Sequence, residues 1–245
     1  MACTRADTCT QSQVGPAERI WKSDKLIPTL LREKLLTAVI PLEAVPDSER
    51  DWHPGSNGFV LNLVHPAWYP IVYGRTMGKL PGSDSATTLV PQELEGTDPK
   101  FVSKRFQFLP SDFSVDGDGK VTLISPYINN IHPTYHKELY SAIPDILQHA
   151  LPMFERVLSD LLRPLLPMRV TLPDDYSPQT PLTVHCRQRY SGDLEVVNNR
   201  ISLRNRTLQV IVRLANIVLT PERPKYPGGK WHVEGLSQPC FAQKG

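Results

Sequence analysis

Apolar residues recur three and four positions apart in residues 23–39, a spacing that puts them on one face of a helix. The stripe consists of Leu26, Ile27, Leu30, Leu31, Leu35, Leu36 and Val39. Pro41 and Pro46 follow it and predict where the helix ends. Because an amphipathic helix buries its apolar face, the sequence predicts a helix packed on a core near the N-terminus.

A longer helical pattern spans residues 132–163. Its apolar positions are Leu139, Ile143, Ile146, Leu147, Ala150, Phe154, Val157, Leu158 and Leu161. Pro144 and Pro152 lie inside the pattern, so we expect them to kink or split the helix. A helix with such an apolar stripe must bury it against another element, and we expect it to pack on a sheet that contains residues 207–219.

Period-two alternation predicts the strands. In residues 207–219 (TLQVIVRLANIVL) the side chains of Leu208, Val210, Val212 and Leu214 share one face. Residues 108–115 and 120–124 flank Asp116-Gly117-Asp118-Gly119, which predicts a hairpin. Shorter strands are expected at residues 184–190, 194–203 and 231–234.

Two proline-containing stretches predict less regular structure. Residues 59–73 alternate apolar and aromatic residues but contain Pro66 and Pro70, so we expect extended pieces around the core, not a central strand. Residues 78–99 read as a loop and as a boundary. The predicted organisation is a disordered tail (1–20), an N-terminal helical and extended segment (21–80), a core (100–235) and a divergent tail (236–245).

Composition narrows the class of protein. The 245 residues are 40% hydrophobic, which is ordinary for a globular chain, and their net charge of +2 gives no electrostatic reason to expect nucleic acid or an anionic membrane as partner. No apolar run approaches the roughly 18 residues that span a bilayer, and no secretory signal is evident. A cytoplasmic location and reduced cysteines are therefore expected.

His232 and Glu234 are the candidate metal ligands. On a strand, residues two apart point to the same face, while Trp231 and Val233 point to the other. An imidazole beside a carboxylate provides two legs of the 2-His-1-carboxylate triad that holds Fe(II) with open positions. His132 and His136 are four apart on the predicted helix, a second and weaker metal spacing.

The segments around these ligands resemble those of a large fungal family of uncharacterised proteins, a domain-of-unknown-function family. The resemblance covers roughly residues 20 to 235. It is carried by VHPAWYPIVYGR (64–75), FQFLPSD (106–112), YINNIHPTYHKELY (127–140), LQVIVRLANIVLTP (208–221) and YPGG with WHVEG (226–235). That family is similar to Fe(II)- and 2-oxoglutarate-dependent dioxygenases, whose core is a double-stranded β-helix. The resemblance implies an α+β fold, an incomplete jelly-roll-like sheet covered by helices, with His232 and Glu234 matching the first two iron ligands.

The resemblance also implies strands beyond Gly235, with a second iron-ligating His and a basic residue for 2-oxoglutarate. Only LSQPCFAQKG follows, and no His comes after His232, so the chain is expected to be C-terminally truncated. A third ligand from upstream, His185 or His132, would require another topology. We expect weak Fe(II) binding and no 2-oxoglutarate turnover by this chain.

Three functions follow as hypotheses. The first is a dioxygenase-like enzyme that oxidises a small molecule, in fungal secondary metabolism. The second is a catalytically inactive relative or non-enzymatic protein. The third is a zinc hydrolase, which would also need a third protein ligand.

Overall fold

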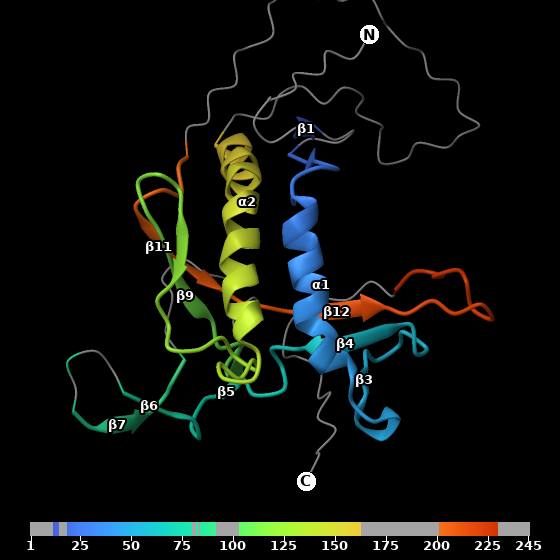
Figure 1. Cartoon of the computed structure of the whole chain (residues 1–245). Coiled ribbons are helices and arrows are strands. Elements are labelled where there is room, and N and C mark those ends of the chain that lie inside the picture. The colour runs from blue at the N-terminus through green and yellow to red at the C-terminus, as the bar shows by residue number, and fades with distance from the viewer. Residues whose placement is uncertain are drawn as a thin grey trace, which may run out of the picture.

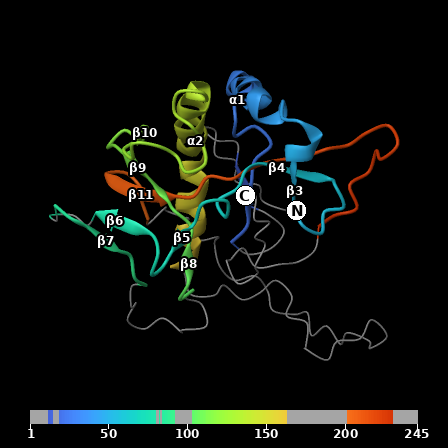
Figure 2. The same cartoon turned by 90° about the horizontal axis from the view of Figure 1, so that it is seen from below.

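Two helices lie side by side through the centre of the molecule (Figure 1). They are α1 (Thr29–Glu43) and α2 (Lys137–Leu161). The structure is a computed structural model and describes residues 12–14, 19–79, 82, 84–91, 103–162 and 201–229. Figure 2, seen from below, shows one group of strands beside α2 and a second group at the end of α1.

The described strands form five antiparallel sheets, none of them closed, so the fold is mixed α/β. Two sheets have three strands each, in the orders β10-β9-β11 and β12-β4-β3. Their strands are β3 (Asp51–Trp52), β4 (Val60–Val64), β9 (Ser111–Val115), β10 (Val121–Leu123), β11 (Arg206–Val210) and β12 (Leu214–Ile217). The two-stranded sheets pair β1 (Gln13–Val14) with β2 (Trp21–Lys22), β5 (Ile71–Val72) with β8 (Phe106–Gln107), and β6 (Met77–Lys79) with β7 (Ala86–Thr88). A 3₁₀ turn, η1 (Asp47–Glu49), follows α1.

Helix α1 begins six residues later than the predicted stretch and continues past its predicted end. It includes Pro41 and stops at Glu43, before Pro46, so the prediction that Pro41 ends the helix is wrong. Pro41 lies in the last turn, and the N–H that proline lacks removes only one backbone hydrogen bond from the helix. Leu31, Ala38 and Val39 are buried, whereas Leu30 and Leu36 are exposed, so the buried face is narrower than the predicted stripe.

Helix α2 packs on the sheet β10-β9-β11, which contains the first part of the predicted strand 207–219, as predicted; it also packs on α1. Pro144 and Pro152 do not split it, since it is continuous from Lys137 to Leu161. The helix buries Leu139, Ala142, Ile143, Pro144 and Leu151 against the core. Phe154, expected in the apolar stripe, is instead 48% exposed.

The predicted hairpin is confirmed. Strands β9 and β10 pair antiparallel, and Val115 lies opposite Val121 across the turn. The Asp116 carboxylate Oδ1 accepts hydrogen bonds from the backbone N–H groups of Asp118 (2.9 Å) and Lys120 (2.8 Å). Its side chain therefore closes the turn by supplying the acceptor that these amides need.

The predicted strand 207–219 is two strands that belong to different sheets. β11 pairs with β9, and after three residues β12 pairs with β4. The predicted alternation nevertheless holds, because Leu208, Val210, Val212 and Leu214 all pack against the core. A single stretch of chain thus supplies an edge strand to both three-stranded sheets.

Two predictions about the proline-containing stretches are wrong. β4 is the central strand of its sheet, because Pro66 and Pro70 lie after its last residue and remove no donor from it. The stretch expected to be a loop begins with a hairpin, β6 with β7.

The described end of the predicted strand 194–203 is not a strand, because the backbone N–H groups of Ile201 and Leu203 donate to Ser159 and Glu155 on α2. The predicted strand 184–190 lies outside the described residues.

The core lies between the two helices and the two three-stranded sheets. Its buried members are Ala38, Val39, Leu61, Leu63, Val64, Phe113, Val115, Val121, Ile128, Ile131, Leu139, Ile143 and Leu151. They come from both predicted segments, 21–80 and 100–235, which also share the sheet β12-β4-β3. The boundary proposed between those segments stays a prediction.

We predict that Leu139→Ala lowers the free energy of unfolding by about 2–5 kcal/mol, because Leu139 is fully buried and its removal leaves a cavity. Phe154→Ala, on the exposed side of the same helix, should cost less than about 1 kcal/mol. Chemical denaturation of both variants measures the difference. Equal losses of unfolding free energy in the two variants would show that α2 does not bury the face that carries Leu139.

Tyr140 joins α2 to the loop before it. Its hydroxyl accepts a hydrogen bond from the Ile128 backbone N–H (2.9 Å) and donates to the Ile131 carbonyl (2.7 Å). Burial raises the pKa of Tyr140, against the opposing effect of the Ile128 N–H. The hydroxyl thus satisfies two backbone groups of a buried turn.

We predict that Tyr140→Phe lowers the free energy of unfolding by about 1–3 kcal/mol, because both backbone groups lose their partner. Tyr135→Phe is the control, since Tyr135 is exposed and should change stability by no more than about 0.5 kcal/mol. Urea denaturation of the two variants measures these changes in the free energy of unfolding. A neutral Tyr140→Phe variant would mean that other groups satisfy Ile128 and Ile131.

Candidate functional site

The predicted ligands His232 and Glu234 lie outside the described residues, as do Trp231, Val233 and His185. Their placement on one side of an extended segment stays a prediction. The structure does describe the chain that leads to them, residues 218–229, and the sheet from which that chain departs. The site is therefore built from these parts.

The chain beyond β12 is held against the turn that precedes β4. The guanidinium of Arg223 stacks over the Phe59 ring at 3.8 Å, and its Nη2 donates to the Asn57 carbonyl at 2.6 Å. Tyr226 meets the same ring edge-on, with centroids 5.8 Å apart. Phe59, only 8% exposed, is thus contacted by two side chains from a segment more than 160 residues away.

Glu222 lies in the tight turn between Thr220 and Arg223. Its carboxylate accepts hydrogen bonds from its own backbone N–H and from the Thr220 side chain, and these lower the pKa of Glu222. The Arg223 backbone N–H donates to the Thr220 carbonyl (3.0 Å), and the Thr220 N–H donates back to the Arg223 carbonyl (3.3 Å). The turn is closed by its own groups.

The face of sheet β12-β4-β3 that points away from α1 carries four polar side chains, here called the polar face: Asp51, His53, Asn62 and Arg213. Asp51 lies opposite Asn62, and Asn62 lies opposite Ala215, so these three share one face. His53 and Arg213 are each two residues from a member of that set and point the same way. A register shift near Leu63 lets Leu61 and Val64 both face the core while Asn62 faces away.

Hydrogen bonds tie the polar face together. The Asp51 carboxylate Oδ2 accepts from Asn62 Nδ2 (3.1 Å) and from the Trp68 indole N–H (2.7 Å). Asn62 is only 6% exposed, and its Oδ1 has no hydrogen-bond partner. Among the described residues no donor reaches this oxygen, and a buried amide oxygen without a donor costs free energy.

Arg213 fixes the tautomer of His53. Its Nη2 lies 3.3 Å from His53 Nδ1, and because a guanidinium only donates, Nδ1 accepts. The His65 ring, 6.2 Å away between centroids, accepts the Ala67 backbone N–H on its own Nδ1 (3.2 Å). Each ring therefore accepts on Nδ1, which places a proton on Nε2 and does not suit a metal ligand.

His132 and His136, the second candidate pair, lie at the N-terminal end of α2. The His132 Nδ1 accepts the Thr134 backbone N–H (3.2 Å), and its ring packs at 4.4 Å on Tyr135. His136 is the residue before the first turn, and its Nδ1 has no hydrogen-bond partner. Within the described residues, no three His, Cys, Asp or Glu side chains come together as a metal site.

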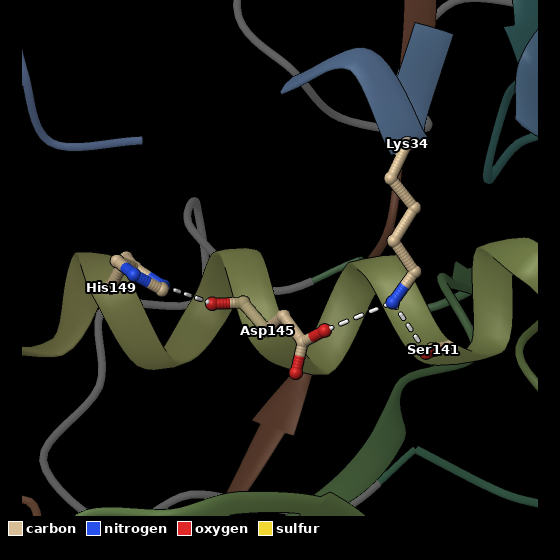
Figure 3. Close-up of polar contacts among 4 residues, drawn as sticks. All are labelled: Lys34, Ser141, Asp145 and His149. Carbon is tan, nitrogen blue, oxygen red and sulfur yellow. Dashed lines mark hydrogen bonds and ion pairs between the residues drawn. The ribbon is translucent and has the colours of Figure 1, made fainter. Parts of the chain in front are cut away.

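Figure 3 shows a polar bridge between the two helices. Lys34 Nζ on α1 donates to Ser141 Oγ (2.5 Å) and to Asp145 Oδ2 (3.1 Å) on α2, and His149 Nδ1 donates to the Asp145 carbonyl (2.8 Å). A serine beside a lysine can serve as nucleophile and base only if the lysine is neutral. Lys34 Nζ instead forms an ion pair with Asp145, so this cluster joins the helices, and the partly exposed pair contributes about 0–1 kcal/mol.

Together these features define a mixed α/β protein whose sheet carries a partly buried polar face next to an anchored turn. The chain belongs to the family described as "Protein of unknown function (DUF4246)", which matches residues 5–240. No curated protein and no solved structure matches the chain significantly. In the part of the chain that the structure describes, no helix combines the length and apolarity needed to cross a membrane.

Sequence reasoning missed the polar face. Residues 51–58 (DWHPGSNG) predict only a turn, and residues 60–64 (VLNLV) predict only apolar packing. The available signal was Asn62, a lone amide between aliphatic residues, because such a residue on a buried strand needs a polar partner. Its partner Asp51 is eleven residues away, a pairing that emerges only from the register of β3 on β4.

We predict a pH dependence of stability from His136. Burial lowers the pKa of His136 below its usual value, and the like charge of His132 lowers it further. The folded state therefore takes up this proton less readily than the unfolded state, so stability is full above about pH 6.5 and falls as the pH drops toward the folded-state pKa.

Thermal unfolding of the wild type and His136→Gln between pH 5 and pH 7.5 tests this. On the acid side, the melting temperature of His136→Gln should fall less than that of the wild type. The melting temperature of His132→Gln should fall by an intermediate amount. Identical pH profiles for wild type and His136→Gln would contradict the assignment.

Proposed function

We propose that the chain is a dioxygenase-like protein of the Fe(II)- and 2-oxoglutarate-dependent type that acts on a small molecule, with His232 and Glu234 as metal ligands. The strands of the two three-stranded sheets would then be part of a jelly-roll-like core. The observation that carries the proposal is the polar face, which belongs to the same sheet as β12, the strand that leads toward these ligands.

The donor chemistry of the two ligands suits iron. A neutral imidazole nitrogen and a carboxylate oxygen are the donor types of the 2-His-1-carboxylate site, which leaves positions open for a co-substrate and dioxygen. When bound, Fe(II) would supply the activation of dioxygen. His53 and His65 do not complete the set, because their Nδ1 atoms already accept hydrogen bonds.

The burial of the polar face supports a site more than a solvated surface. An antiparallel sheet often turns a polar face to water. Here, however, Asn62 is buried, and Asp51, His53 and Arg213 are half-buried. Burying such groups costs free energy unless they are hydrogen-bonded, and convergent polar groups in a partly apolar setting are typical of ligand sites.

The polar face would bind and orient oxygen-containing groups. The Arg213 guanidinium, which donates to His53, brings positive charge to this face, which suits carboxylate or carbonyl oxygens. Asp51 already accepts from Asn62 and Trp68, so its role would be to hold these two side chains in position. Asn62 Oδ1 would accept from a hydroxyl or amine of the bound molecule.

We predict that the chain binds Co(II), used in place of Fe(II), weakly, and that His232→Ala and Glu234→Ala each remove this binding. Two protein ligands leave most coordination positions to water, so either loss removes half of the protein's donors. His149→Ala is the control, because its imidazole belongs to the bridge between the helices. Anaerobic titration followed by the Co(II) absorption spectrum measures the affinities.

Binding that survives in His232→Ala, or that disappears in His149→Ala, would contradict the proposed ligands. Succinate release from 2-oxoglutarate in air, measured on the same proteins with Fe(II), separates a functioning dioxygenase from an inactive relative. Wild type that neither binds metal nor releases succinate would favour the inactive relative.

A further inference from the structure

We propose that the outward face of helix α1 is the surface through which two copies of this chain associate. The two α1 helices would pack against each other in opposite directions about a two-fold axis. The basis is a largely apolar, exposed helix face that lies between two ends of opposite charge. The proposal is independent of the proposed function, because it concerns neither the polar face nor the metal ligands.

Helix α1 carries apolar side chains on both of its sides. In Figures 1 and 2, α2 runs along one side of α1, and β3, β4 and β12 lie at its C-terminal end. Toward these elements α1 buries Leu31, Ala38 and Val39. The outward apolar side chains, with their exposed fractions, are Leu30 (80%), Leu36 (48%) and Ile40 (54%). At 3.6 residues per turn, these three positions fall within about 120° of the helix circumference, so they form one face.

This face is poor in charge. The exposed positions of α1 are Thr29, Leu30, Arg32, Glu33, Leu36, Thr37, Ile40 and Pro41. Of these, only Arg32 and Glu33 are charged, and they are adjacent and of opposite sign. The water-facing side of a helix normally consists of polar and charged residues, whereas the centre of a protein interface is depleted of charge. The composition of the outward face is therefore closer to that of an interface than to that of a solvated surface.

The two ends of α1 carry opposite charge. The basic side chains of residues 19–32 are Arg19, Lys22, Lys25 and Arg32, against Asp24 as the acidic one. The acidic side chains of residues 43–50 are Glu43, Asp47 and Glu49, against Arg50 as the basic one. Lys22, Lys25, Asp47 and Glu49 are all exposed. The helix dipole, positive at the N-terminus and negative at the C-terminus, has the same direction as this difference.

The charge difference favours one orientation of two α1 helices and one kind of partner. In a parallel pair, ends of like charge would meet and repel each other. In an antiparallel pair, the basic end of each copy lies beside the acidic end of the other, so the charges are complementary at both ends of the contact. A two-fold axis perpendicular to the helices produces this arrangement, because it brings the same surface of both copies together. An anionic membrane would attract only the basic end.

The contact is small. The fifteen residues of α1 span about 22 Å, and one helix face of this length belongs to the small end of protein interfaces. Interfaces of this size are typically weak and transient. We therefore expect a reversible dimer that dissociates on dilution.

Sedimentation equilibrium of the full chain over about 1–100 μM, where weak complexes dissociate, measures this association. Wild type should shift from monomer to dimer as its concentration rises. Leu36→Lys should weaken dimerisation by about 10-fold or more, because the two-fold axis places two like charges in an apolar contact. Phe154→Lys is the matched control, since Phe154 lies on α2 and is also 48% exposed, and it should dimerise like wild type. Both variants should melt within a few degrees of wild type, because both positions are exposed.

Charge reversal tests the orientation. Lys22→Glu with Lys25→Glu makes both ends of α1 acidic, and Asp47→Lys with Glu49→Lys makes both ends basic. Each double variant should dimerise more weakly than wild type, because like charges then meet at both ends of the antiparallel contact. An equimolar mixture of the two should recover the dimer. Added salt should weaken the wild-type dimer, since it screens exposed charges.

Several outcomes would overturn the proposal. A wild type that stays monomeric at about 100 μM would exclude a dimer of the expected strength. A dimer that Leu36→Lys leaves unchanged would mean that another surface makes the contact, and a mixture that does not recover the dimer would exclude the antiparallel arrangement. A monomer that floats with anionic vesicles would assign the face to a lipid surface. A monomer in which Leu36→Lys lowers the melting temperature far more than Phe154→Lys would mean that the chain itself buries this face.

Discussion

The stretch of chain from Arg206 to Val218 is the constraint on which the described structure depends. Its first half completes the sheet of β9 and β10, and its second half completes the sheet of β4 and β3. Leu208, Val210, Val212, Leu214 and Val218 of this stretch pack on the core, and its backbone pairs with two different strands. Since β9 and β4 lie about fifty residues apart in the chain, this segment is what joins their sheets.

The same alternation determines which face of the sheet carries polar side chains. Because Val212 and Leu214 face the core, Arg213 between them must face away from it, toward Asp51, His53 and Asn62. The register shift at Leu63 has the same effect on β4, because it lets Leu61 and Val64 face the core while Asn62 faces away from it. The polar face is thus a direct consequence of burying the aliphatic residues on the other side.

Much of this architecture is visible in the sequence, and the failures have physical causes. The hairpin at Asp116, the two helices and the alternating face of residues 208–214 follow from turn chemistry and periodicity, which act locally. The central position of β4 does not, because strand order depends on which distant strand pairs with it. For the same reason the polar face was missed, although Asn62 was a signal. The ligands His232 and Glu234 remain a prediction from the alternating tripeptide and from the resemblance.

Burial, more than residue type, sets Asn62 apart from the polar bridge between the helices. Lys34 and Asp145 form an ion pair at 3.1 Å, and their partly exposed side chains join two helices. Asn62 is a neutral amide, yet it is buried, holds Asp51 and leaves Oδ1 without a donor. Keeping such a group in a strand costs stability that a valine would not cost, and this cost is why Asn62 supports the proposal that the polar face is a ligand site.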